Sequence, residues 1–160
     1  MPTPPLDPES HPGLDPSHLL LIVVGAHLRA EQGDRPLAYR LREQVQGWVS
    51  KHRDTLATPI QPVVCTDIWY LNHSILHARP TVSIGGPGVN ALSSHFAQSI
   101  TGRDDTDQQV VIQIDPEFTD LRVSIWGTDH DLTAKGLELF FKDYLESFLK
   151  AVATQVEPET

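Results

Sequence analysis

The stretch PTVSIGGPGVNALSSHF, residues 80–96, joins two different kinds of local pattern. Its first part is a short β-branched apolar run typical of a buried strand, and after Asn90 the apolar residues recur at the spacing of a helix face. Three glycines, a proline and an asparagine stand within the six positions from Gly85 to Asn90. This composition predicts a tight strand-to-helix turn, whose glycines would let the backbone approach a ligand closely.

On both sides of this stretch the chain alternates strand-like and helix-like segments. The apolar run LLLIVVGA, residues 19–26, is typical of a parallel strand that is covered on both faces. Residues 34–53 follow a helical period, with Asp34 placed as the N-cap. Residues 63–68 and 81–84 are two more buried strands, and the segment between them is too irregular to predict a definite helix.

The C-terminal half ends in two strands and a strongly amphipathic helix. VVIQI, residues 110–114, and RVSIW, residues 122–126, are separated by a short link that suits a hairpin better than a parallel crossover. One edge of the sheet is therefore expected to be antiparallel. Which of the two strands runs against the sheet stays open, and so does the edge at which the polar turn 127–131 lies. The acidic stretch 102–109 predicts a surface loop.

Together these segments predict one α/β domain over residues 18–153. We expect a three-layer domain of the Rossmann-like or flavodoxin-like kind, with a mostly parallel sheet of about five strands and one antiparallel edge strand. Residues 1–17 contain six prolines and form a proline-rich arm, and residues 154–160 form a polar tail. The arm has almost no apolar side chains to bury.

Charge and composition exclude several classes of partner. The formal net charge of −9 disfavours nucleic acids and anionic membranes, and the longest apolar run is far shorter than the roughly 20 residues of a membrane span. Cys65 is the single cysteine, so no internal disulfide is possible, and its apolar surroundings predict a small buried hydrophobe rather than a nucleophile. With no predicted leader segment, we expect a cytoplasmic protein.

The candidate site lies where three parallel strands are expected to end together. Ligands of such sheets bind at the carboxyl ends of the strands, where the strand order changes direction. The expected ligand contacts come from the glycine-rich turn and one cation, and the acid–base candidates follow the first two strands. These residues are Gly85, Gly86, Gly88, Asn90 and Arg29 for binding, and His27 and Asp67 for acid–base chemistry.

Two known kinds of site are weighed against this pattern. Gly86, Gly88 and Ala91 satisfy G-x-G-x-x-A between a strand and a helix, with Asp115 after the next strand as a candidate ribose-binding acid. Dinucleotide binding is therefore an alternative, and no particular cofactor is identified. His73 and His77 have the spacing of metal ligands, but no third ligand stands nearby, so no metal site is expected.

One resemblance bears on the two glycine turns. SIGGPGVNAL and the later IWGTDHDLTAKGLELF resemble the strand, Gly-Gly-Pro turn and Gly-x-Asp turn of archaeal surface-layer α/β modules and bacterial cell-wall-binding repeats. The matching residues are Gly85, Gly86, Pro87 and Asn90, then Gly127, Asp129 and Thr133, the last one place later than the pattern requires. The resemblance implies that such turns can be purely architectural.

The sequence thus predicts a protein that binds a small polar or anionic ligand at the glycine turn. A nucleotide-like molecule is one ligand of this kind. The alternative is a non-catalytic assembly or protein-interaction module. Whether any reaction is catalysed stays open. The wide apolar stripe of residues 137–152 further predicts a homodimer or a higher homo-oligomer.

Overall fold

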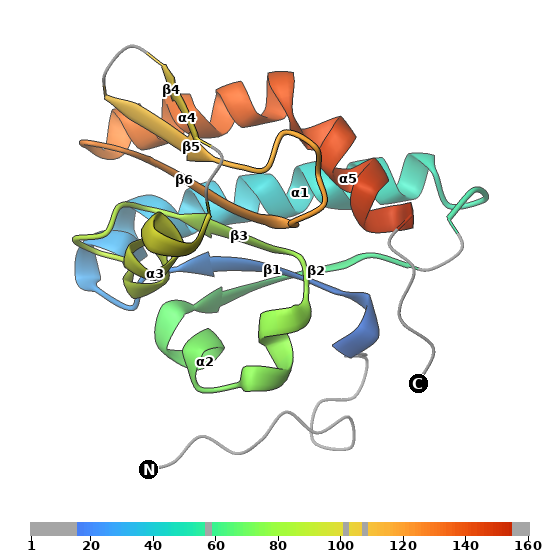
Figure 1. Cartoon of the computed structure of the whole chain (residues 1–160), viewed down its shortest axis with the longest axis horizontal. Coiled ribbons are helices and arrows are strands. Elements are labelled where there is room, and N and C mark those ends of the chain that lie inside the picture. Colours follow the sequence, from blue (N-terminus) through green and yellow to red (C-terminus); the bar gives the residue numbers. More distant parts are fainter. Residues whose placement is uncertain (1–15, 57–58, 101–102, 107–108, 155–160) are drawn as a thin grey trace.

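The computed structural model describes residues 16–56, 59–100, 103–106 and 109–154 (Figure 1). Within them a six-stranded sheet has the order β2-β1-β3-β6-β5-β4. The strands are β1 (Leu19–Val24), β2 (Gln61–Thr66), β3 (Thr81–Ile84), β4 (Arg103–Thr106), β5 (Val110–Gln113) and β6 (Arg122–Gly127). The sheet carries helices on both faces, so the expected three-layer α/β class is confirmed.

The direction of the strands follows the sequence expectation in most respects. Strands β2, β1, β3 and β6 are mutually parallel, and β5 runs antiparallel to β6. The expected hairpin is therefore confirmed, and β5 is the strand that runs against the others.

Strand β4 corrects the expected loop over 102–109 and brings the expected sheet of about five strands to six. It pairs antiparallel with β5, which moves β5 away from the edge. An acidic sequence can form such an edge strand because backbone pairing with one neighbour suffices there, and charged residues are common on exposed edges.

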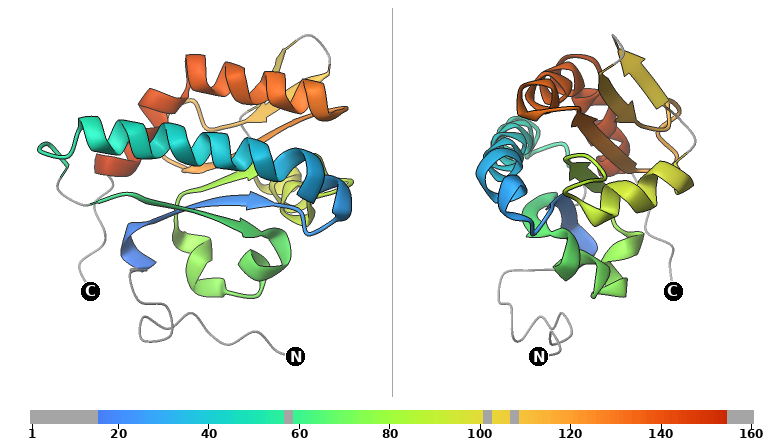
Figure 2. Two further views of the ribbon diagram at one scale, coloured as in Figure 1. Left: turned by 180° about the vertical axis from the view of Figure 1, so that it is seen from behind. Right: turned by 90° about the vertical axis from the view of Figure 1, so that its left-hand side faces the viewer.

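The helices divide into two layers. Figure 2 shows α1 beside the C-terminal helices on one side of the sheet, with the shorter helices on the other. The first layer holds α1 (Arg35–Lys51), α4 (His130–Asp143) and α5 (Leu145–Thr154). The second holds α2 (Asp67–Leu71), the 3₁₀ turn η3 (Ser74–Ala78) and α3 (Ala91–Ser99). The segment 69–79, for which no definite helix was expected, is thus two short helical pieces.

Strand β1 lies at the centre of the core. Leu20, Ile22 and Val24 face the layer of α1, α4 and α5, and the alternating residues Leu19, Leu21 and Val23 face the layer of α2 and α3. All six are almost completely buried. This arrangement confirms the expectation of a strand covered on both faces.

The C-terminal amphipathic stripe is covered within the single chain. The predicted single helix breaks at Tyr144 (φ −130°, ψ −28°) into α4 and α5. Leu137, Phe140 and Phe148 are all but fully buried in the core beneath α1 and the sheet, and Phe141 is half-buried against them. The expected excess of exposed apolar surface is therefore wrong. The oligomer that it suggested stays a prediction.

Little of the terminal segments is described. Most of the proposed arm, residues 1–15, and the tail from 155 lie outside the described residues. Within the part of the chain that the structure describes, no helix combines the length and the apolar character that crossing a membrane requires. A cytoplasmic location stays a prediction.

Candidate functional site

The strand order changes direction between β1 and β3. From β1 the chain passes through α1 to β2 on one side of it, and then through α2 to β3 on the other. The connections run over opposite faces of the sheet, so they leave a crevice at the carboxyl ends of β1 and β3. In Figure 1 the arrowheads of β1, β2 and β3 point toward this end.

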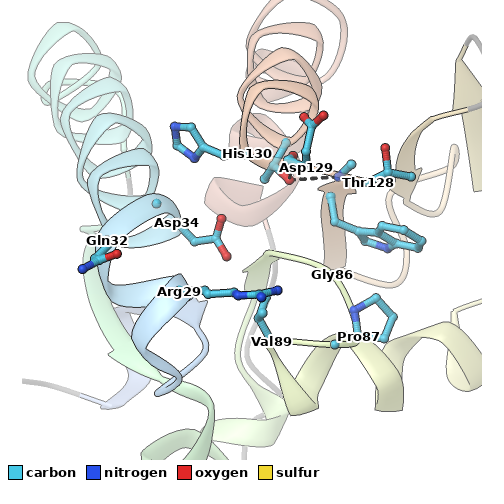
Figure 3. A pocket seen from close by; sticks show the side chains of 14 residues that line it. Arg29, Gln32, Asp34, Gly86, Pro87, Val89, Thr128, Asp129 and His130 are labelled. Carbon is cyan, nitrogen blue, oxygen red and sulfur yellow. Dashed lines mark hydrogen bonds between the residues drawn. The ribbon is translucent and has the colours of Figure 1, made fainter.

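A cleft of about 730 Å³ opens at this end of the sheet (Figure 3). Three segments that each follow a parallel strand build its walls. They are Arg29 and Gln32–Asp34 after β1, Gly86–Val89 after β3, and Trp126–His130 with Thr133 at the end of β6. The glycine-rich turn is therefore part of a concave site, together with a third segment whose position could not be fixed from the sequence.

Asp34 is the most unusual residue of the cleft. Its side chain is only 7% exposed, yet its carboxylate accepts no hydrogen bond from any residue in the described ranges. A carboxylate oxygen packs against Gly85, where an added Cβ would overlap it. The expected role as N-cap is wrong, because the π-helical turn η2 (Ala30–Asp34) leads into α1 and the side chain makes no capping bond. Carboxylates on largely buried residues are ordinarily paired, whereas this one has no hydrogen-bond partner among the described residues and opens into the cleft.

The burial of Asp34 has a consequence for stability. Loss of solvation raises the pKa of its carboxyl from 3.8 to about 6, and the charge of His130 partly opposes this rise. Because the folded state holds this proton more tightly than the unfolded chain, the stabilisation is complete below pH 4 and is lost as the pH rises through about 6.

We therefore expect Asp34→Asn to stabilise the ligand-free protein at neutral pH. The shift of about two pKa units corresponds to roughly 2–3 kcal/mol at pH 7, and the gain should disappear near pH 4. Urea unfolding of both proteins at several pH values between 4 and 7.5 measures the difference. Asp54→Asn on the exposed surface is the matched control. A difference between Asp34→Asn and the native protein that stays constant over this range would contradict the prediction.

The three glycines of the turn differ in backbone conformation and in what covers them. Gly85 has a φ of +107°, and its N–H donates to the carbonyl of Ile125 at 3.0 Å. Gly86 lies under the ring of Trp126. Gly88 does not have a positive φ, and nothing within 4 Å would meet a Cβ there. Gly86 and Gly88 both line the cleft, whereas Gly85 forms the buried base of the turn.

Asn90 serves the turn rather than the cleft. Its Oδ1 accepts the N–H of Leu92 at 2.9 Å and so caps α3. Its Nδ2 donates to the carbonyls of Ile84 and Val23 and to the Ser83 hydroxyl. The residue is 1% exposed, so the side chain ties the ends of β1 and β3 to the helix.

Asp67 has a similar structural position. Its Oδ1 accepts the N–H groups of Ala26 and Ile68 at 3.1 and 2.7 Å, and its Oδ2 accepts the N–H of Ala91 at 2.8 Å. The carboxylate is 6% exposed and does not line the cleft. Because Asp67 and Asn90 already occupy N–H groups of the first turn of α3, that turn is not an open anion site.

His27 and Arg29, the two candidates that follow β1, differ in their position relative to the cleft. His27 is exposed and outside the cleft, where its Nδ1 accepts the N–H of Arg29 at 3.2 Å. Arg29 lines the cleft, and Figure 3 shows its guanidinium directed toward the space that Asp34 also faces. Of the expected binding residues, Arg29, Gly86 and Gly88 therefore meet in one site.

The third wall is the turn after β6. Asp129 caps α4 by accepting the N–H of Leu132 at 2.8 Å, and Thr133 Oγ1 accepts the N–H of Gly127 at 3.0 Å. The ring of His130 lies over Gly33, whose added Cβ would stand 2.9 Å from His130 Nδ1. The buried Nε1 of Trp126 has no hydrogen-bond partner among the described residues.

Asp34, Trp126 and His130 are the cleft residues that sequence reasoning missed. The helical pattern around Asp34 fitted an ordinary cap, so nothing marked the residue as a site. The polar turn after β6 was noticed, but its edge depended on the direction of β6, which only the parallel pairing with β3 decides.

The acid of the dinucleotide pattern lies elsewhere. Strand β5 is antiparallel, so its carboxyl end and Asp115 lie at the opposite edge from the cleft. There the Asp115 carboxylate accepts N–H groups of Glu117, Thr119 and Asp120, and these bonds lower its pKa. The motif therefore lacks its ribose-binding partner, and its three spaced residues form only a turn and a helix start.

Other reactive groups do not join the site. Cys65 is buried in β2, and desolvation raises the pKa of its thiol to about 12. No group of three or more potential metal ligands occurs among the residues that the structure describes.

Comparisons of the chain with protein-family models, with curated proteins and with solved structures find no match. The resemblance to surface-layer and cell-wall-binding modules therefore stays a prediction, and function has to be inferred from the cleft.

Proposed function

We propose that this protein binds a small polar molecule in the cleft at the carboxyl ends of β1, β3 and β6. The observation that carries the proposal is the carboxylate of Asp34, which lies on a residue only 7% exposed, has no hydrogen-bond partner among the described residues and opens into that cleft. Partial desolvation of this carboxylate disfavours its charged form, so it costs the ligand-free protein stability at neutral pH. A ligand that donates hydrogen bonds to it would remove this cost.

The place and size of the cleft support the same proposal. It lies at the change in strand order, where open α/β sheets hold their ligands. Its volume of about 730 Å³ falls within the range of about 300–1,000 Å³ that is usual for small-molecule sites. Trp126, Pro87 and Val89 supply apolar walls, and Asp34, Arg29 and His130 supply the polar groups.

The charges favour a polar ligand over a strongly anionic one. Among the described residues that line the cleft, Arg29 carries the permanent positive charge, whereas Asp34 and Asp129 are acids. The first turn of α3 is already occupied by side chains of this chain. A ligand with one anionic group at Arg29 fits this balance, and a nucleoside triphosphate does not.

Asp34 and His130 replace His27 and Asp67 as the acid–base candidates if the bound molecule is also turned over. Burial raises the pKa of Asp34 to about 6, which is suited to proton exchange near neutral pH. His130 acts on Asp34 through its charge and lines the same cleft.

The proposal is tested by ligand screening with a variant that fills the cleft. A library of small polar metabolites is screened by thermal shift and by ligand-observed NMR, with the native protein, Gly88→Val and Gly47→Val. Nothing lies within 4 Å of a Cβ at Gly88 or at Gly47, and Gly47 is on α1 outside this cleft. We expect Gly88→Val to weaken binding of any hit at least tenfold, with Gly47→Val unchanged. Hits that are indifferent to Gly88→Val, or the absence of any hit, would contradict a ligand in this cleft.

A further inference from the structure

Two oppositely charged side chains face the cleft without pairing. Asp34 accepts no hydrogen bond within the described residues, and the Arg29 guanidinium forms no ion pair or hydrogen bond within them either. The charge that acts on Asp34 is that of His130. Figure 3 shows the Asp34 carboxylate and the Arg29 guanidinium directed toward the same space in the cleft.

From this arrangement we propose that the ligand is a zwitterion of the α-amino-acid class, with its ammonium group on Asp34 and its carboxylate on Arg29. The inference rests on the proposed function and narrows it. The carboxylate of a residue that is only 7% exposed is poorly solvated, and an ammonium group offers it both hydrogen-bond donors and an opposing charge. Hydroxyl groups would donate hydrogen bonds but bring no opposing charge.

Arg29 would bind the carboxylate end of the ligand. A guanidinium offers a planar pair of N–H donors that matches a carboxylate. Because Arg29 is exposed, its side chain can adjust its position to the carboxylate. Both charged groups of an α-amino acid are attached to its Cα, so its side chain would branch off there and lie against the apolar walls from Pro87, Val89 and Trp126.

The net charge of the cleft agrees with a zwitterion. The permanent charges of Arg29, Asp34 and Asp129 sum to about −1 when both carboxylates are ionised, so a dianionic or trianionic ligand would be repelled. A zwitterion adds no net charge and places each of its groups beside the opposite sign.

The experiment measures binding of the free α-amino acids by isothermal titration calorimetry and thermal shift at pH 7.5. Each amino acid that binds is compared with its N-acetyl derivative, which lacks the ammonium group, and with its amide, which lacks the carboxylate. We expect at least one free amino acid to bind, and both derivatives to bind at least tenfold more weakly.

Two substitutions test which residue binds each end of the ligand. Asp34→Asn is isosteric, and Arg29→Gln changes an exposed side chain. Asp34→Asn should weaken binding of the free amino acid at least tenfold and leave the weak N-acetyl derivative unaffected. Arg29→Gln should weaken the free amino acid and leave the weak amide unaffected. The matched controls Asp54→Asn and Arg53→Gln, both exposed and outside the cleft, should change neither.

The alternative outcomes separate this inference from the function on which it rests. Equal binding of the free and N-acetylated forms, or binding of nucleoside monophosphates or sugars with no amino acid bound, would overturn the zwitterion while a ligand in the cleft stands. If no compound of any of these classes binds, and the polar metabolite screen also yields no hit that depends on Gly88, both proposals fail.

Discussion

Replacement of Asp67 by alanine is expected to lower the free energy of unfolding by about 3–5 kcal/mol. The substitution leaves the N–H groups of Ala26, Ile68 and Ala91 without their acceptor, and each unsatisfied buried donor costs about 1–3 kcal/mol, reduced where water can enter. The free energy of unfolding of Asp67→Asn should lie between those of the native protein and Asp67→Ala, because an amide retains only one acceptor oxygen. Chemical denaturation followed by circular dichroism measures the change.

The control for Asp67 is Asp54→Ala, an exposed acid that should change stability by less than about 0.5 kcal/mol. Denaturation of Asp67→Ala at the native midpoint would show that the three hydrogen bonds do not hold the ends of β1 and α3 together. If Asp67→Ala is too unstable to study, the smaller loss expected for Asp67→Asn still tests the role.

Replacement of Gly25 by alanine is expected to destabilise the protein by about 3 kcal/mol or more. An added Cβ would overlap the carbonyl oxygen of Val89 and stand 2.8 Å from its carbonyl carbon. Both are backbone atoms, so relief requires the end of β1 or the glycine turn to move, and overpacking of this kind costs about 1–3 kcal/mol even where side chains can yield. Thermal and urea unfolding measure the loss.

Gly88→Ala is the matched control for Gly25→Ala. Gly88 belongs to the glycine turn that Gly25 contacts, its φ is not positive, and a Cβ there meets nothing within 4 Å. We expect its stability to stay within about 0.5 kcal/mol of the native protein. Equal losses at Gly25 and Gly88 would mean that the turn requires glycine for conformational freedom throughout, and not for the close approach of two strands at Gly25 alone.

The candidate site could be predicted from the sequence only in part. The glycine turn and Arg29 were placed correctly at the carboxyl ends of strands, because strand, turn and helix patterns are local and parallel strands end at the same edge. His27 and Asp67 also follow strands, but His27 faces outward and Asp67 serves the backbone. Position after a strand does not say whether a side chain faces the ligand space or a neighbouring N–H group.

The sequence by itself determined the local elements: a central strand buried on both faces, the tight turn at Gly85–Asn90, and an amphipathic C-terminal segment. The tertiary structure decided which distant residues these elements bring into contact. Asp67 accepts hydrogen bonds from residues 41 and 24 positions away. Asp34 packs against Gly85 because β1 pairs in parallel with β3, and it feels the charge of His130 because β6 pairs in parallel with β3. Hydrophobic period and turn chemistry act over a few residues, whereas strand order depends on free-energy differences summed over the whole core. The cleft is built from three loops distant in sequence, and it exists only after that order is set.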